Sequence, residues 1–202
     1  MFPSNPIRML AVAAALQLCA AASFAQASGV SCQLVNDGAQ LQLADGLDDL
    51  PAGPLAAPLK RSCDPGSPWP EGTYTAGAGR GVLNVVEVFG SADYHGLSAA
   101  QKNAAVVFGD FAPDATGFAM VVHGADKDGN FVKNTKLHIL VKAVDGSVVW
   151  SKHFLVNDVG YSIGLSSSSP IATVEVKRST TQPNGIDDSH VVVDTFYTSR
   201  YK

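Results

Sequence analysis

Short runs of alternating apolar and polar residues dominate the chain after residue 81. Each run is rich in β-branched or aromatic side chains and ends at glycine, proline, asparagine or aspartate, which is typical of strands joined by turns. The expected strands are residues 82–89, 104–108, 117–123, 136–144, 147–156, 171–177 and 190–197. Only residues 96–105 have a pattern that could form a helical turn. Short strands at regular spacing predict an all-β domain, an antiparallel β-sandwich of jelly-roll-like topology.

Residues 28–80 follow a different pattern, although we expect them to form one domain with the sandwich core at 81–202. A first strand is expected near residues 33–43. The segment after it is crowded with proline and glycine, which remove ladder donors and interrupt helices, so we expect irregular chain. Cys32 and Cys63 are the two cysteines that follow residues 1–27, and they are expected to form a disulfide because an exported protein meets an oxidising compartment. The disulfide would tie this segment over the sandwich.

Residues 1–27 have the pattern of a secretory signal peptide. Arg8 is the only charge, an apolar run follows it, and small residues stand where a signal peptidase reads. The run is too short and wrongly flanked for a membrane span. The mature chain is expected to start at Gln26 or Ser28 and to be secreted or periplasmic.

Net charge narrows the choice of partners. The formal charge of −4 argues against nucleic acid and against anionic membrane surfaces. No second long apolar run follows the signal, so no membrane span is expected.

The sharpest local signal is Asp145 followed by Gly146, which predicts a two-residue type I′ turn between two strands. In that register Val141 faces Trp150 and Ala143 faces Val148, and this apolar side of the hairpin is expected to be core.

On the other side of the same hairpin, the register pairs His138 with His153. Two imidazoles on one face can hold zinc if a third ligand joins them. The sequence shows no third ligand, and a solvated cross-strand pair is the favoured interpretation.

A G-x-S-x-G motif at residues 160–164 would make Ser162 the nucleophile of a serine hydrolase. Asp187, Asp188 and His190 follow in the order that such a triad needs. The chain after Gly164 cannot begin a helix, however, and a nucleophile elbow lies between a strand and a helix. A kinked strand is therefore favoured, and no catalysis is expected, with hydrolase as the enzyme alternative.

Two features could bind ligands. Asp126 begins a calcium-loop-like run, but Phe131 and Leu137 stand where an EF-hand needs glycine and glutamate, so a hairpin turn is favoured. Aromatic rings at a sandwich rim can stack on sugars. The candidates are Trp69, Tyr94 and Tyr161, and ordinary loop packing is the alternative for each.

The order of segments in the last half of the chain is distinctive. Gly117 and Phe118 are followed by a D-x-D-G run from Asp126, then by an I-x-x-V-x-V run from Ile171, and then by a last strand carrying Asp194. Over about residues 103–198 this order resembles the jelly-roll β-sandwich domains of exported bacterial proteins, akin to carbohydrate-binding and galactose-binding-like modules.

The resemblance implies a sandwich that acts as a non-enzymatic binding module for a glycan. It places Asp194 at the aspartate of the final strand. With Asp187 and Asp188, whose loop offers hard oxygens, Asp194 forms the candidate set for a structural calcium ion. The alternative to a glycan is a structural or adhesive role in the envelope, with another protein as partner.

Overall fold

The computed structural model describes residues 30–35, 40–62, 73–88, 91–101, 103–126, 128–158, 160–182 and 189–201. These residues form strands, turns and bends, and no helix is found among them. Accordingly, the described part of the chain holds no helix that is long and apolar enough to cross a membrane.

The described strands are short and follow one another with brief connections. In chain order they are β1 Val30–Val35, β2 Gln40–Asp45, β3 Gly53–Pro54, β4 Leu59–Ser62, β5 Thr73–Ala78, β6 Leu83–Val88, β7 Ser91–Ala99, β8 Ala105–Gly109, β9 Gly117–Ala125, β10 Thr135–Ala143, β11 Val148–Val156, β12 Tyr161–Ser166, β13 Ile171–Arg178 and β14 His190–Tyr201.

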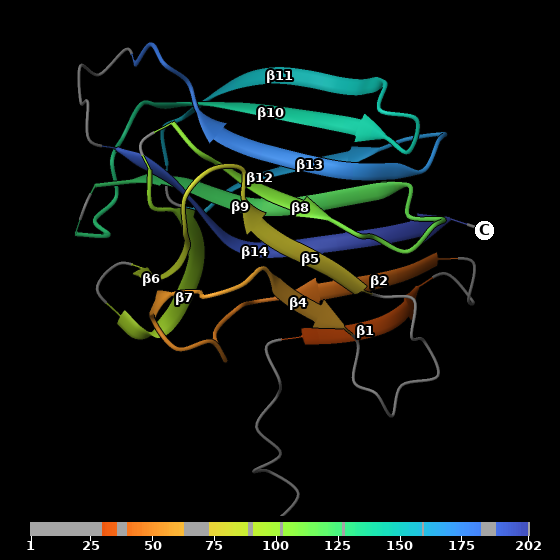
Figure 1. The fold of residues 1–202 in the computed structure, drawn as a ribbon, viewed down its shortest axis with the longest axis horizontal. Coiled ribbons are helices and arrows are strands. Elements are labelled where there is room, and N and C mark those ends of the chain that lie inside the picture. The colour runs from red at the N-terminus through yellow and green to blue at the C-terminus, as the bar shows by residue number, and fades with distance from the viewer. Residues whose placement is uncertain are drawn as a thin grey trace, which may run out of the picture.

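The strands form two antiparallel sheets, which confirms the expected all-β sandwich. Sheet B has the order β11-β10-β13-β8-β5-β4, and its first three strands lie side by side at the top of Figure 1. Sheet A is centred on the long strand β14. One edge of β14 pairs with β9, which pairs in turn with β12, and the other edge pairs with β7 and β2.

The core lies between the sheets because alternate side chains of each strand point inward. In β10, Leu137, Ile139 and Val141 are fully buried while the residues between them are half-buried. At the centre of the core, the rings of Phe108 and Phe196 stack across the two sheets with centroids 3.9 Å apart. Aromatic burial of this kind contributes strongly to the stability of a sandwich.

A buried ion pair holds the proline- and glycine-rich segment against the sandwich. The Asp45 carboxylate at the end of β2 is fully buried and accepts hydrogen bonds from Arg61 Nε of β4 at 2.6 Å and from the Tyr74 hydroxyl of β5 at 2.8 Å. Arg61 also donates to Asp49 at 2.6 Å. This network joins sheet A to sheet B, and the segment is more regular than expected because it contributes β3 and β4.

The predicted disulfide falls outside the described residues. Cys63 is not among them, and for Cys32 only its backbone place in β1 is described. The disulfide stays a prediction.

Two sequence-based expectations for the sheets were wrong. The single first strand at 33–43 is a hairpin, in which Val35 of β1 pairs with Gln40 of β2. The possible helical turn at 96–105 is occupied by the end of β7, whose Leu97 is fully buried and pairs with Val85 of β6. Sheet pairing overrides the weak helical pattern there, since burial in the core decides between the two.

The β10–β11 turn also differs from the prediction by one residue. The amide of Ala143 donates to the Ser147 carbonyl, the amide of Gly146 donates to the Ala143 carbonyl, and Gly146 has φ 81°. This is a three-residue loop with a glycine bulge rather than a two-residue type I′ turn. Val148 therefore pairs with Lys142 instead of Ala143, while Val141 still pairs with Trp150 as predicted.

Candidate functional site

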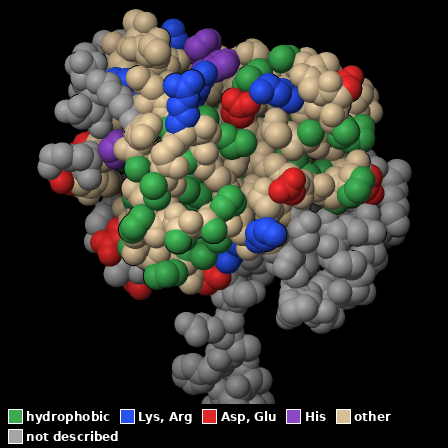
Figure 2. Space-filling model, in the orientation of Figure 1, with side chains coloured by type: hydrophobic (Ala, Val, Ile, Leu, Met, Phe, Trp, Pro, Cys, Tyr) green, Lys and Arg blue, Asp and Glu red, His purple; other side chains and the backbone are tan. Residues whose placement is uncertain are grey.

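The outer face of sheet B carries several polar groups that could bind a ligand. Because the buried residues of β10 point inward, Lys136, His138 and Lys142 lie on the outer face, and they have β13 and β11 on either side. Figure 2 shows histidine side chains gathered with lysine or arginine side chains at the top of this face, near β10 and β11 in Figure 1.

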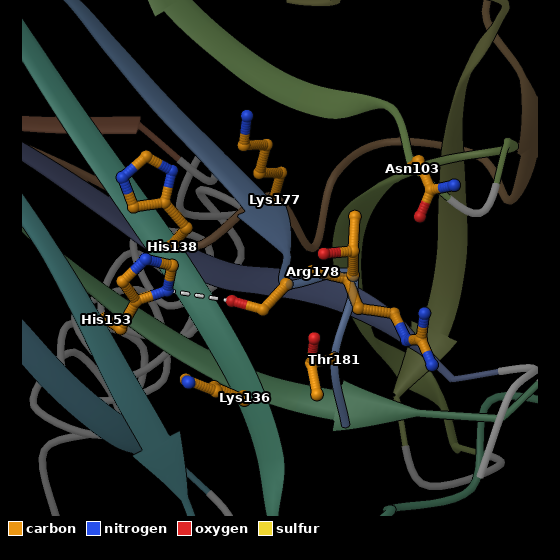
Figure 3. A pocket seen from close by; sticks show the side chains of 9 residues that line it. Asn103, Lys136, His138, His153, Lys177, Arg178 and Thr181 are labelled. Atoms are coloured by element: carbon orange, nitrogen blue, oxygen red, sulfur yellow. Dashed lines mark hydrogen bonds between the residues drawn. The ribbon is translucent and has the colours of Figure 1, made fainter. Parts of the chain in front are cut away.

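A pocket of about 280 Å³ lies at this end of the face (Figure 3). It is lined by Asn103, Lys136, His138, His153, Lys177, Arg178, Ser179, Thr180 and Thr181. A wider groove of about 640 Å³ adjoins it, because Asn103 and Lys177 line both. Gly79 and Ala105 line the groove and leave space in it, because they have little or no side chain.

The predicted pairing of His138 with His153 is confirmed, and the two rings stack with centroids 4.6 Å apart. His138 Nε2 lies 2.9 Å from the Ser151 hydroxyl, and His153 Nδ1 lies 2.8 Å from the Ser179 hydroxyl. Partial burial lowers the pKa of His138, and the nearby His153 and Lys177 lower it further, while Glu175 acts in the opposite direction. His138 is therefore mostly neutral at pH 7.

The turn after β13 forms one wall of the pocket. Gln182 accepts a hydrogen bond from the Lys136 amide at 2.8 Å and donates to the carbonyls of Lys136 and Ser179 at 2.9 Å and 2.7 Å. These bonds fasten the turn to β10, so the Ser179 hydroxyl is held beside His153. A wall fixed in this way needs little reordering when a ligand binds.

The pocket is cationic although the chain as a whole is acidic. Lys136 and Lys177 line it, and no Asp or Glu is among the described residues that line it. In the adjoining groove, Glu175 is already paired with Lys142 at 2.7 Å. Ammonium groups, imidazoles and hydroxyls together offer mainly hydrogen-bond donors, which suits a ligand rich in hydroxyl or anionic oxygens.

The aromatic residues singled out from the sequence do not line this site. Tyr94 lies on β7 and is 58% exposed, and Tyr161 lies on β12 and is 38% exposed. Tyr161 sits against Phe154 with ring centroids 6.4 Å apart. Trp69 lies outside the described residues. The structure does not bring Tyr94 and Tyr161 to neighbouring strands, since β9 and β14 lie between β12 and β7.

Of the candidate calcium ligands, only Asp194 is described, since Asp187 and Asp188 fall in a part of the chain that is not. Asp194 stands at an irregularity in the pairing of β14 with β9. Burial and the neighbouring carboxylate of Asp48 raise the pKa of Asp194 to about 6. Within the described ranges, no three His, Cys, Asp or Glu side chains gather in a way that could hold a metal ion.

Two motifs have local structures that account for them. Ser162 lies inside β12, where it pairs with Val121, rather than at a turn from a strand into a helix. The Asp126 carboxylate accepts hydrogen bonds from the amides of Asp128 and Asn130 at 2.9 Å each. As expected, the run from Asp126 is a hairpin turn closed by its own side chain.

Sequence reasoning found the two histidines but missed the lysines and Ser179 around them. Lys136 could have been found, since it lies on the same face as His138 by alternation along one strand. Lys177 and Ser179 could not, because they reach the pocket only through the pairing of β13 with β10.

Neither a protein-family model nor a curated protein matches the sequence. Among solved structures, the chain is similar to CsCBM6-3 from Clostridium stercorarium in complex with cellobiose, with 13% identity and a TM-score of 0.35 over 59% of this chain and 82% of that chain. It is also similar to CBM29-2, a family 29 carbohydrate-binding module, with 10% identity and a TM-score of 0.39 over 71% of this chain and 92% of that chain.

A third similar structure is an exo-beta-1,3-galactanase from Phanerochaete chrysosporium with galactose, with 11% identity and a TM-score of 0.34 over 71% of this chain and 30% of that chain. For this chain the likeness concerns the fold alone, and the ligands named are those of the other proteins.

Proposed function

We propose that this protein is an exported, non-catalytic module that binds a glycan along the outer face of sheet B. The observation that carries the proposal is the pair of adjoining hollows on that face, of about 280 Å³ and 640 Å³. Their sizes suit small-molecule ligands such as sugar rings.

The walls of the groove supply the polar groups that sugar hydroxyls require. Arg80, Gln101 and Asn103 line one part of it, and Glu175 and Lys177 line another. Amide and charged side chains can each donate or accept toward a hydroxyl group. Export is supported by the signal-like residues 1–27, and the absence of catalysis is supported by the place of the one motif serine inside a strand.

A glycan array, probed with and without calcium, tests the proposal. Binding is expected for the wild-type protein and is expected to weaken severalfold in Asn103→Ala, because Asn103 lines both hollows. Tyr94→Ala and Tyr161→Ala are the matched comparison, since both rings are exposed elsewhere. If only the tyrosine variants lose binding, the site is the aromatic one that the sequence suggested. If no glycan binds in any condition, the proposal is wrong.

The calcium arm tests whether Asp194 takes part in a cation site, as the sequence suggested. A calcium-dependent gain in binding that disappears in Asp194→Asn would support such a site. Equal binding in calcium and in chelator would count against it.

One observation favours a second function, adhesion to another protein. Among the described strands, β11 pairs only with β10 and β12 pairs only with β9, so both sheets have an open edge. Val148 on β11 is 59% exposed and Leu155 is 44% exposed. Open edges with apolar side chains can pair with another chain. Sedimentation of wild type and Leu155→Lys tests this role. If the open edge binds another chain, the wild-type protein should self-associate or bind a partner, and the Leu155→Lys variant should not.

A further inference from the structure

Among the described residues, the pocket in Figure 3 is lined by Lys136, Lys177 and Arg178 and by no Asp or Glu. Lys136 and Lys177 stand on either side of the histidine pair in this view. Glu175, a described acidic residue on the same face, is already bound to Lys142 at 2.7 Å. A cationic pocket attracts an anionic ligand even in a chain of net charge −4, because the local field depends on the groups that line the pocket.

The hydrogen bonds of the two imidazoles leave one nitrogen of each ring available. His138 uses Nε2 toward Ser151, and His153 uses Nδ1 toward Ser179. No described residue forms a hydrogen bond with His138 Nδ1 or His153 Nε2. The stacked rings, with centroids 4.6 Å apart, therefore carry two such nitrogens, and Lys136 and Lys177 line the same pocket beside them.

We propose that this pocket binds the acidic group of a sugar, a carboxylate or a sulfate ester, between the imidazoles of His138 and His153 and the ammonium groups of Lys136 and Lys177, and that binding strengthens as the pH falls. The inference rests on the proposed glycan-binding function and names the class of glycan. The adjoining groove, which shares Lys177 and Asn103 with the pocket, accommodates the rest of the sugar chain.

The pH dependence follows from the charges that face His138. These are His153 on β11, Lys177 and Glu175 on β13, and Lys136 on the same strand. Without a ligand, burial and the two cations favour the neutral imidazole. A bound anion favours the imidazolium and raises its pKa, so the complex takes up a proton that the free protein lacks. Affinity must then rise as the pH falls from the pKa of the imidazole in the complex towards its lower pKa in the free protein.

The test compares three probes by titration calorimetry at about pH 5 and about pH 7.5, on either side of the ordinary histidine pKa. An oligogalacturonate carries carboxylates, a heparin oligosaccharide carries sulfate esters, and a cello-oligosaccharide is neutral. We expect at least one acidic probe to bind more tightly than the neutral one. The affinity of that acidic probe should be about fivefold higher at the lower pH than at the higher pH, which is the scale of one exposed charge contact. Whichever acidic probe binds shows whether the pocket recognises a carboxylate or a sulfate ester.

Variants locate the effect. Lys177→Gln is expected to weaken binding of the acidic probe about fivefold. Lys152→Gln is the matched control, because it removes the same charge from β11 at a residue that does not line the pocket. The double variant His138→Gln with His153→Gln is expected to lose the pH dependence while Lys136 and Lys177 still bind. Unchanged thermal melting shows that each variant is folded.

The outcomes separate the two proposals. If the neutral and acidic probes bind equally and Asn103→Ala weakens both, the glycan site stands and the acidic-sugar inference is overturned. The inference is also overturned if acidic probes bind but Lys177→Gln and Lys152→Gln behave alike. Failure of all three probes, together with a negative array, contradicts both proposals.

Discussion

Replacing Arg61 with methionine tests whether a buried ion pair anchors the N-terminal segment. Arg61 is buried, with 9% of its side chain exposed, and it contacts an Asp45 side chain that is not exposed at all. Burial by itself would lower the pKa of the Arg61 guanidinium, but its hydrogen bonds with Asp45 and Asp49 outweigh burial and raise that pKa above its ordinary value. Methionine retains an apolar stem and removes only the charged group.

The expected loss of stability is large because the substitution leaves the Asp45 carboxylate buried without its cation. The hydrogen bonds from Tyr74 at 2.8 Å and from the Leu47 amide at 3.0 Å remain, but they do not neutralise the charge. Breaking a buried pair in this way costs about 3–5 kcal/mol. With a urea m-value of about 2 kcal/mol per molar, the unfolding midpoint should fall by roughly 1.5–2.5 M.

Urea unfolding followed by tryptophan fluorescence measures this change, and Lys142→Met provides the control. Lys142 and Glu175 form an ion pair of similar length, 2.7 Å, but 36% and 24% of their side chains are exposed. An exposed pair contributes less than about 1 kcal/mol, so its loss should hardly move the midpoint. Equal midpoint shifts in the two variants would refute the assignment of the Asp45 pair as an anchor.

Three further outcomes are expected. Gly124→Ala should lower stability by about 1–3 kcal/mol in urea unfolding, because the added methyl would overlap the Thr135 side chain, whereas Gly77→Ala, with no atom within 4 Å of the added methyl, should change it little. Asp194 has a pKa raised from 3.8 to about 6, so the folded state holds a proton there that the unfolded state loses, and stability falls as the pH rises between these values. Asp194→Asn should therefore gain stability over wild type as the pH rises through that window, and a constant difference would contradict the assignment. Ser162→Ala should leave activity on a panel of esters at the wild-type level, and activity lost in the variant would restore the hydrolase interpretation.

The structure supports the sequence analysis best where interactions are local. Val141 was expected on the core side of its hairpin and is fully buried, whereas Val148, expected on the same side, is 59% exposed. The pairing of His138 with His153 followed from a hairpin whose strands are joined by a few residues. Even here the turn itself was misassigned, since the Asp145–Gly146 pair fits both a two-residue turn and a glycine-bulge loop, and the loop changes the register beside it.

Contacts between distant parts of the chain were not predictable in the same way. Alternation says which face of a strand a residue occupies but not which strand will lie next to it. Ser179 reaches His153 across 26 positions, and Arg61 reaches Asp45 across 16. The ion pair lies in a segment expected to be irregular, because its proline and glycine content hid the two short strands β3 and β4.

The sequence by itself determined the all-β class, the positions of most strands after residue 81, the polar and apolar faces of the β10–β11 hairpin and the histidine pair on it. Each of these depends on side-chain periodicity and on turns of a few residues, which are properties of neighbouring positions. The tertiary structure alone decided that β13 lies beside β10, which brings Lys177 and Ser179 to the histidines and makes a cationic pocket. The pairing of β13 with β10 depends on how both sheets bury their apolar faces together. The free energy of this packing comes from contacts across the whole core, so no single segment of the sequence determines it.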